Sequence, residues 1–301
     1  MQEDIRIGDI VYSNAKSPTE VVLIGFPSDE GVRRNGGRVG AARAPELIRS
    51  IFKRLTPHPE HFDDHVAVLS SMHDVGDVDV SGDLEADQQL LGSLVGSVLG
   101  SNQIPVIIGG GHETSFGHVL GYDQLRQKVS IINWDAHPDV RPLKDGRSHS
   151  GSPFRQALEL GRGTVLDYTV AGLQPQHVAR EHLQYINSRK SAWFWAEELD
   201  RVAVQGIFHG VTKSTMVSID MDVVNQAYAP GVSAPTAGGI TDRQLFEIAY
   251  QAGLHPLVRS IDVVEVNPEY DQDMRTVRLA AMALWWFTLG LAKRPRKKRA
   301  D

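Results

Sequence analysis

The chain contains no cysteine, and this absence excludes both a disulfide scaffold and a thiol nucleophile. A protein without thiols suits a reducing compartment, so we expect a cytoplasmic location. Long apolar runs are also missing. The longest, Leu279–Leu291, spans 13 residues, whereas a membrane-spanning helix needs roughly 20. We therefore expect a buried final helix and no membrane partner. The N-terminus shows no charged-then-apolar signal region.

The chain also lacks internal repeats and linkers rich in glycine, serine or proline. Its 301 residues suffice for one large α/β domain or two smaller ones, and the missing linker favours a single domain over residues 1–292. Residues 293–301 carry a basic run and are predicted to be a disordered tail. Such a run can contact nucleic acid, but the net charge of −6 favours a solvated tail, so no nucleic-acid partner is expected.

Short apolar runs alternate with helix-like stretches along the chain, and this order predicts one doubly wound, mostly parallel sheet in an α/β fold. Runs rich in valine and isoleucine are typical of strands buried on both faces. The predicted strands are Glu20–Gly25, Gln103–Ile108, Val129–Trp134, Thr164–Ala171, Ala192–Ala196, Met216–Asp220 and Leu257–Val264. The predicted helices include Arg43–Phe52, Asp87–Leu99, Arg180–Ile186 and Asp242–Gly253.

Metal-type ligands follow three of these predicted strands. They are His112 after Gln103–Ile108, then Asp135, His137 and Asp139 after Val129–Trp134, and Asp220 and Asp222 at the end of Met216–Asp220. In an extended segment, residues two apart point to the same side, so the members of each set can face one cavity. In open α/β sheets the ligand crevice lies beyond the carboxyl ends of the strands, where all six candidates fall.

Taken singly, a Gly-Gly-Gly-His segment is also typical of a turn with a surface histidine, and Asp-x-Asp after a strand is typical of a loop or a helix cap. The set Asp135, His137 and Asp139 is less ordinary, because it places three ionisable groups against a buried strand. Three sets that agree in type and placement favour a metal site, because unpaired buried charges are costly and a metal compensates them. Imidazole plus carboxylate suits a borderline-hard ion such as Mn²⁺. Four carboxylates neutralise the charge of two such ions, which indicates a two-metal hydrolytic site.

Four motifs in this chain resemble those of the ureohydrolase family, which includes arginases, agmatinases and formimidoylglutamases. They are Gly109-Gly110-Gly111-His112, Asp135-Ala136-His137-Pro138-Asp139, Ser218-Ile219-Asp220-Met221-Asp222 and Glu265-Val266-Asn267-Pro268. The match runs in order from about Val21 to Leu291. The resemblance implies an arginase-like three-layer α/β/α fold, a homo-oligomer, and a centre of two Mn²⁺ ions per subunit.

The same resemblance implies roles for individual residues. The implied metal ligands are His112, Asp135, Asp139 and Asp222, together with the shared Asp220 and His137. Glu265 matches the acidic residue with which this family contacts the cationic nitrogens of its substrate. From its placement alone, Glu265 is equally well interpreted as a solvated residue at the end of a strand.

Two features resemble the formimidoylglutamase branch in particular. A loop after the first predicted strand has the sequence Gly31-Val32-Arg33-Arg34-Asn35, which closely resembles the corresponding motif of that branch. Arg141 stands where arginases tend to have asparagine. Arginine binds carboxylates bidentately, and formimidoylglutamate carries two carboxylates whereas agmatine has none. Arg155 and Asn133 are further candidates for substrate binding. Either arginine can instead form a plain structural ion pair.

Two positions depart from the wider family. Arginases and agmatinases carry His-Gly-x-Pro where this chain has Ser150-Gly151-Ser152-Pro153, so serine takes the place of a proton-transferring histidine. This serine resembles formimidoylglutamases, which commonly show Ser-Gly-Thr there. His149 lies one residue early and is a candidate proton shuttle. Asn225 stands where the family usually has a third aspartate after Asp220 and Asp222. Because it removes one negative charge near the site, we expect an altered metal affinity.

The predicted function is hydrolysis of the formimino C–N bond of N-formimidoyl-L-glutamate to L-glutamate and formamide, a step of histidine breakdown. One alternative is a hydrolase of guanidino compounds, of the agmatinase, arginase or guanidinobutyrase type. The other is a non-catalytic relative that binds metal, which Asn225 and the displaced His149 favour. The complete set of six ligands together with Glu265 argues for an enzyme that acts on a small molecule.

Overall fold

A computed structural model describes residues 4–11 and 19–295 of the chain. Its centre is a sheet of eight parallel strands in the order β2-β1-β3-β8-β7-β4-β5-β6. The strands are β1 (Val21–Phe26), β2 (Met72–Asp77), β3 (Ile104–Gly109), β4 (Val129–Trp134), β5 (Val165–Leu173), β6 (Ala192–Trp195), β7 (Thr215–Asp220) and β8 (Val258–Val264). The doubly wound parallel sheet predicted from the sequence is therefore confirmed.

Seven of these strands lie within two residues of the predicted apolar runs at each end. The remaining strand, β2, was not predicted. Its sequence, Met-His-Asp-Val-Gly-Asp, contains no apolar run, and its residues alternate between less and more exposed positions. β2 is an edge strand, where only part of the surface is covered, so the pattern of a fully buried strand does not apply to it.

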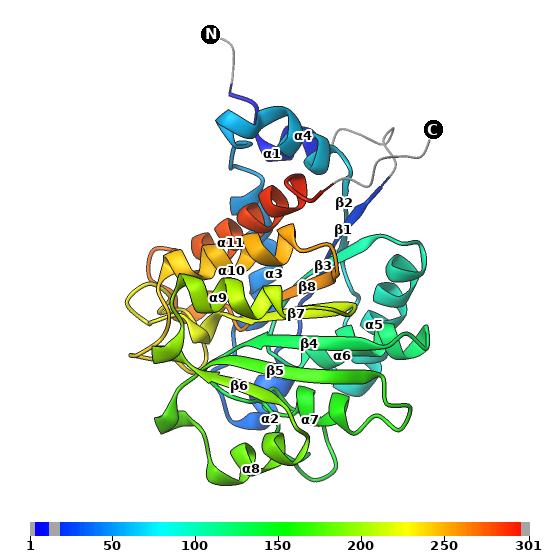
Figure 1. Ribbon diagram of the computed structural model, residues 1–301, viewed down its shortest axis with the longest axis vertical. Coiled ribbons are helices and arrows are strands. Elements are labelled where there is room, and N and C mark those ends of the chain that lie inside the picture. The colour runs from blue at the N-terminus through cyan, green and yellow to red at the C-terminus, as the bar shows by residue number, and fades with distance from the viewer. Residues whose placement is uncertain (1–3, 12–18, 296–301) are drawn as a thin grey trace.

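Helices cover both faces of the sheet (Figure 1), which confirms the three-layer arrangement. The helices are α1 (Ile7–Val11), α2 (Glu30–Asn35), α3 (Ala44–Phe52), α4 (Phe62–Ser70), α5 (Leu84–Gly100), α6 (Thr114–Gln124), α7 (Pro153–Leu158), α8 (Arg180–Ser188), α9 (Arg201–His209), α10 (Asp242–Leu254) and α11 (Arg275–Ala292). Buried residues of α3, α9, α10 and α11 form one apolar core with the sheet, and those of α5, α6 and α7 form a second core with its other face.

The apolar run Leu279–Leu291 lies in α11, most of which is buried, as expected. Among residues 4–11 and 19–295, no helix is both long and apolar enough to cross a membrane. Beyond α11, Lys293 pairs with Asp64 at 3.1 Å, and Nη2 of Arg294 donates to the carbonyl oxygen of Val258 at 2.9 Å. The packed body of the chain therefore includes the first residues of the predicted tail, while residues 296–301 lie outside the described part.

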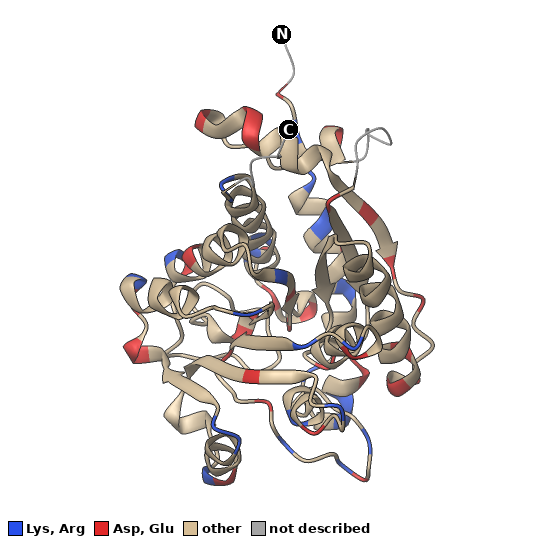
Figure 2. Ribbon diagram, turned by 45° about the vertical axis from the view of Figure 1, so that its right-hand side comes forward, with Lys and Arg blue, Asp and Glu red and all other residues tan. Residues whose placement is uncertain are grey.

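The order of the strands determines where a site can form. The chain builds β1, β2 and β3 on one side and β4, β5 and β6 on the other, and then inserts β7 and β8 between them. The carboxyl ends of β3, β8, β7 and β4 therefore meet in the middle of one edge, where ligand crevices of open α/β sheets lie. Figure 2 shows basic and acidic residues interspersed over the described helices and loops. At the strand-end edge, four aspartates lie close together: Asp135, Asp139, Asp220 and Asp222.

Candidate metal centre

The chain packs closely against its neighbours at the end of β3, and this packing places His112 at the edge formed by the carboxyl ends of the strands. A Cβ atom at Gly110 would lie 1.9 Å from the carbonyl oxygen of Ser28, and one at Gly111 would lie 2.1 Å from Oε2 of Glu113. The backbone of Ser28 leaves no room for a side chain at position 110, so glycine is required there, and a side chain at position 111 would displace Glu113. The glycine run therefore lets β3 pass directly into α6, with His112 at the turn.

The other two ligand segments reach the same edge with less regular backbones. Asp139 has φ +44°, a left-handed conformation that aspartate tolerates better than most residues. Asp222 lies in a short 3₁₀ turn, Met221–Val223, directly after β7. The expectation that each set lies in an extended segment is therefore wrong for these two residues. Both residues nevertheless line the same cavity as His137 and Asp220.

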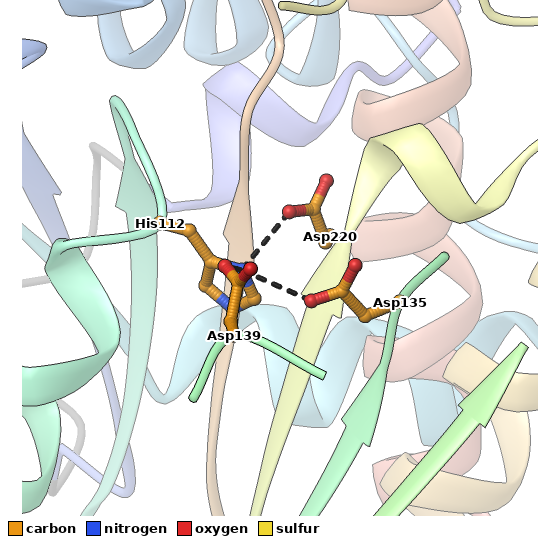
Figure 3. A group of neighbouring side chains, drawn as sticks. All are labelled: His112, Asp135, Asp139 and Asp220. Atoms are coloured by element: carbon orange, nitrogen blue, oxygen red, sulfur yellow. Dashed lines mark ion pairs between the residues drawn. The ribbon is translucent and has the colours of Figure 1, made fainter. Parts of the chain in front are cut away.

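Three carboxylates surround one nitrogen of His112 (Figure 3). Nδ1 lies 2.9 Å from Oδ2 of Asp220 and 3.0 Å from Oδ2 of Asp139. The third oxygen, Oδ2 of Asp135, is 3.3 Å away. One nitrogen has at most one proton to donate, so these contacts cannot all be hydrogen bonds. A cation placed among the four atoms would satisfy all of them, and the group has the geometry of a metal site.

A second group of potential ligands adjoins the first. Nδ1 of His137 lies 3.0 Å from Oδ2 of Asp222 and 3.5 Å from Oδ1 of Asp135. Asp135 therefore belongs to both groups, with one oxygen toward each histidine. Asp220 falls in the first group and His137 in the second, so the sharing of these two residues between metals, implied by the family resemblance, stays a prediction.

The electrostatics of the two groups indicate a missing positive charge. Burial raises the pKa of Asp220 well above its ordinary range, and the charges of Asp222 and Asp135 raise it further. Burial alone would lower the pKa of His137, but the carboxylates of Asp222 and Asp135 raise it to about 12. The cluster holds more negative charge than a buried site tolerates, and divalent cations compensate such charge. Two imidazoles and four carboxylates fit Mn²⁺.

Neighbouring donors orient the carboxylates. Nδ2 of Asn133 donates to Oδ2 of Asp135 at 3.0 Å, and the backbone N–H of His137 donates to Oδ1 of Asp135 at 2.7 Å. In the same way, the backbone N–H of Asp222 donates to Oδ1 of Asp220 at 2.8 Å. Such outer hydrogen bonds fix the direction of metal ligands. Asn133 is fully buried in β4, so it supports Asp135 and does not reach the cavity, contrary to the predicted contact with substrate.

Glu265 follows β8 and lines the cavity with φ +64°. Its Oε1 accepts a hydrogen bond from the backbone N–H of His112 at 2.8 Å, and its own N–H donates to the carbonyl oxygen of Gly110 at 2.8 Å. Burial raises the pKa of Glu265 well above its ordinary range, and the charge of Glu113 raises it further. Burial also raises the pKa of Glu113, to about 7. Two acidic groups thus share this side of the site.

The cavity at the two ligand groups has a volume of about 210 Å³. Its lining residues are Asn35, Gly36, Gly37, His137, Asp139, Arg141, Ser150, Asp220, Asp222, Ser233, Ala234 and Glu265. At its mouth, the exposed Arg141 donates from Nη1 to Oδ1 of Asn35 at 3.2 Å, and Nδ2 of Asn35 donates to Oγ of Ser150 at 3.1 Å. Two larger cavities, of about 470 and 620 Å³, contain none of the six candidate ligands.

Two loops form the mouth of the cavity and are bonded to each other. The mostly buried guanidinium of Arg34 donates from Nη1 to Oε1 of Glu85 at 2.7 Å and to the carbonyl oxygen of Ser148 at 3.0 Å. In return, Nζ of Lys144 donates to the carbonyl oxygen of Arg34 at 3.2 Å. The segment after β1, which includes α2, and the loop after β4 are therefore held together by hydrogen bonds at the cavity.

His149 lies in the second of these loops, but it does not line the cavity. Its Nε2 is 2.9 Å from the carbonyl oxygen of Pro142, and its Nδ1 accepts a hydrogen bond from the backbone N–H of Gly151 at 3.2 Å. Both ring nitrogens are therefore engaged within the loop, and the ring is buried. A role in proton transfer requires this ring to leave both partners.

Two other positions singled out from the sequence, Arg155 and Asn225, belong neither to the cavity lining nor to the ligand groups. Nε of Arg155 donates to Oε1 of Glu159 at 3.1 Å, and its guanidinium lies 4.4 Å from the ring centroid of Tyr185. This is the plain ion pair that the sequence left open, and Arg155 does not line the cavity. The side chain of Asn225 donates to the carbonyl oxygen of Ala237, and it belongs to neither ligand group.

Sequence reasoning missed a set of buried polar residues beneath His112. They are Ser115, His118, Ser218 and Asp262, all fully buried. Asp262 interrupts the apolar strand β8, and a charged residue in such a strand needs a partner. That rule was a signal for Asp262, but the partners come from α6 and β7 and could not be identified from the sequence.

Comparison with known proteins places this geometry in a family. The model of the Arginase family matches residues 19–290. The formimidoylglutamase of Geobacillus sp. (strain WCH70) is 35% identical over 291 residues, covering 93% of this chain and 86% of that protein. The formimidoylglutamase of Rhodococcus jostii (strain RHA1) is 37% identical over 281 residues, covering 88% of this chain and 83% of that protein.

The solved structures give the same result. A crystal structure of Trypanosoma cruzi formiminoglutamase with Mn²⁺ superposes with a TM-score of 0.89 at 33% sequence identity. The match covers 97% of this chain and all of that chain. The similarity therefore extends over the whole described sheet and its helices, including the strand ends that carry the ligands.

Proposed function

The chain belongs to the arginase family, and we propose that it is a hydrolase with two Mn²⁺ ions that acts on N-formimidoyl-L-glutamate. The reaction consumes one water. A C–O bond forms at the formimino carbon, the bond from that carbon to the glutamate nitrogen breaks, and this nitrogen takes up a proton. The products are formamide and L-glutamate. Relatives named formimidoylglutamase that align over most of the chain support this assignment.

One observation carries the choice of substrate within the family. Arg141 and members of both groups of potential metal ligands line the same cavity: Asp139 and Asp220 from the first group, and His137 and Asp222 from the second. A substrate that spans this cavity therefore presents its reacting carbon to the ligands and an anionic end to Arg141. N-formimidoyl-L-glutamate has that distribution of charge, because its formimino group is cationic and its two carboxylates are anionic. Agmatine would leave Arg141 facing a second cation.

Each residue then has a defined task. When bound, the two Mn²⁺ ions would act as Lewis acids and activate water for attack on the formimino carbon. Glu265 accepts hydrogen bonds from the cationic nitrogens of the formimino group, because its carboxylate faces the cavity beside the ligands. Arg141 binds a carboxylate through its planar fork, and Asn35 supports the guanidinium from the opposite loop. Ser150 lies next to Asn35 and completes the mouth.

The experiment compares four substrates with protein that has been stripped of metal and reloaded with Mn²⁺. We expect glutamate and formamide from formimidoylglutamate, and this activity should vanish without Mn²⁺. Urea from arginine, agmatine or guanidinobutyrate, with no reaction of formimidoylglutamate, would contradict the proposed substrate and favour a guanidino hydrolase. If the metal-bound protein released no product from any of the four substrates, a non-catalytic relative would be favoured.

A matched pair of variants tests the task of Arg141. Charge-assisted hydrogen bonds contribute about 1.5–3 kcal/mol, so Arg141→Ala should lower kcat/KM for formimidoylglutamate by about ten- to a hundredfold. Arg155→Ala removes the same side chain outside the cavity and should leave kcat/KM unchanged within about twofold. Equal effects of the two substitutions would contradict the role of Arg141 as the carboxylate-binding residue.

We also propose that the enzyme works in the cytoplasm as a homo-oligomer. The absence of cysteine suits a reducing compartment. Self-association is common in the family, and light scattering coupled to gel filtration measures it directly. A mass equal to that of one 33.1 kDa chain at micromolar concentration would contradict the oligomer.

A further inference from the structure

A layer of polar side chains lies beneath His112, on the face of the sheet that α6 covers. Ser218 in β7 and Asp262 in β8 are register partners on adjacent strands. Ser115 and His118 are three residues apart on α6, so they face the same side of that helix. All four are fully buried, and none lines the cavity above the ligands.

Hydrogen bonding in this layer converges on Asp262. Its Oδ1 accepts from Oγ of Ser218 at 2.5 Å. Its Oδ2 accepts from Oγ of Ser115 at 3.0 Å and lies 2.7 Å from Nδ1 of His118. An ionised carboxylate can only accept, so the neighbouring groups must donate to it. Asp262 therefore fixes the direction of the hydrogen bonds around it.

The order of donors and acceptors set by Asp262 extends through Ser218 to His112. A serine hydroxyl has one hydrogen, and Ser218 gives it to Asp262, so Oγ can only accept from its other neighbours. One of them is Oγ of Ser115 at 3.0 Å, whose own hydrogen also goes to Asp262. The remaining neighbour is Nε2 of His112, at 3.0 Å, and it must donate. The proton of the His112 ring consequently lies on Nε2, and Nδ1 presents a lone pair to the three carboxylate oxygens that surround it.

We propose that Asp262 is a positioning residue for the metal centre. Through Ser218 it selects the tautomer of His112 in which Nδ1 is free to bind a metal, and His118 holds Asp262 in place. The proposal rests on the metal centre of the proposed function and is independent of the identity of the substrate. Metal-ligating histidines commonly depend on such a partner at the second nitrogen, and losing it typically costs ten- to a hundredfold in affinity.

Two details favour a dedicated role over general packing. Within the described part of the chain, Asp262 has hydrogen bonds and ion pairs only with Ser218, Ser115 and His118, so no lysine or arginine compensates its burial. Nε2 of His118 has no partner among the described residues, which favours a proton on Nδ1, donated to Asp262. An asparagine of equal size would avoid the buried charge. Its NH₂ group could donate to Ser218, however, and the Ser218 hydroxyl would then be able to donate to His112 and no longer select its tautomer.

The test compares Asp262→Asn with Tyr122→Phe in the full-length protein. Tyr122 lies on the same face of α6, is fully buried, and bonds Oγ of Ser260 at 2.6 Å, outside the network. Titration calorimetry with Mn²⁺ alone should show ten- to a hundredfold weaker binding for Asp262→Asn and a change below twofold for Tyr122→Phe. Binding by Asp262→Asn within twofold of the wild type, or equal losses in both variants, would overturn the proposal.

A second measurement needs no folded variant of Asp262. In ¹⁵N-histidine NMR spectra of the Zn²⁺-loaded wild type, the signals of His112 should show the proton on Nε2, with assignment by comparison with His112→Asn. A proton on Nδ1 would overturn the proposal. Neither readout uses a substrate, so an inactive protein with these properties would contradict the proposed function and leave the role of Asp262 intact.

Discussion

His65 provides a test of the fold that is independent of the metal centre. This histidine lies on α4 and is fully buried against α11. Its Nδ1 accepts from the backbone N–H of His58 at 3.1 Å, and its Nε2 lies 2.9 Å from Oγ1 of Thr288. Because Thr288 gives its own hydrogen to the carbonyl oxygen of Trp285, Nε2 must be the donor. The neutral ring is thus satisfied at both nitrogens, and a second proton would break the bond to His58.

Burial, together with the smaller effect of the charge of His58, lowers the pKa of His65 from 6.5 to about 4. Between these two values the unfolded chain binds the proton and the folded chain does not, so stability increases with pH across this window. The contribution is fully present above pH 6.5 and is lost as pH falls toward 4. At about 1.36 kcal/mol per pKa unit, the total is about 3 kcal/mol, of which about 2 kcal/mol falls between pH 7 and pH 5.

Urea unfolding of the wild type and of His65→Gln, measured at pH 7 and pH 5 in EDTA, isolates this contribution. The free energy of unfolding of the wild type should fall by about 2 kcal/mol more than that of the variant between the two pH values. His73→Gln, which removes an exposed histidine of β2, is the control and should fall as much as the wild type. Equal losses in all three proteins would refute the reasoning, because His65 would then not be held neutral by the fold.

Three further outcomes are expected. Removing the metal should lower the midpoint of thermal unfolding. Adding Mn²⁺ at 100 times its dissociation constant should raise the free energy of unfolding by about 2.7 kcal/mol, measured by scanning calorimetry. An unchanged midpoint would contradict the metal centre. Gly110→Ala, whose Cβ would lie 1.9 Å from the carbonyl oxygen of Ser28, should destabilise the fold by about 1–3 kcal/mol in urea unfolding. Arg34→Ala removes bonds to Glu85 and Ser148, so we expect a loss of about 2 kcal/mol in the same assay and a higher KM; an unchanged KM would show that the loops act separately.

The sheet and the position of the site could be predicted because both depend on local patterns. Apolar runs mark strands that are buried on both faces, and metal-type residues directly after them must lie at the carboxyl edge. The detailed backbone could not be predicted in this way. Asp139 has a left-handed backbone conformation, and Asp222 lies in a 3₁₀ turn. Tertiary contacts impose both conformations.

Hydrogen-bond partners distant in sequence were the main limit. Asn133 was expected to contact substrate, but Asp135 takes up its amide, and the sequence contains no sign of that choice. Arg155 lies on α7 with Glu159 four residues later, a spacing that already permitted the ion pair now seen. Asp262 needed partners from two other elements, and only the packed structure brings them together.

The bonds between the two loops at the mouth bear on how specificity can change. Arg34, Asn35 and Lys144 connect the loops after β1 and β4, so neither loop has a conformation independent of the other. Transplanting only the loop after β4 from a relative with another substrate would replace Lys144 and the segment whose carbonyl at Ser148 accepts from Arg34, so the bonds between the two segments would be lost. Substrate preference should therefore evolve, or be engineered, by exchanging both loops together, while the strand ends and their ligands stay unchanged beneath them.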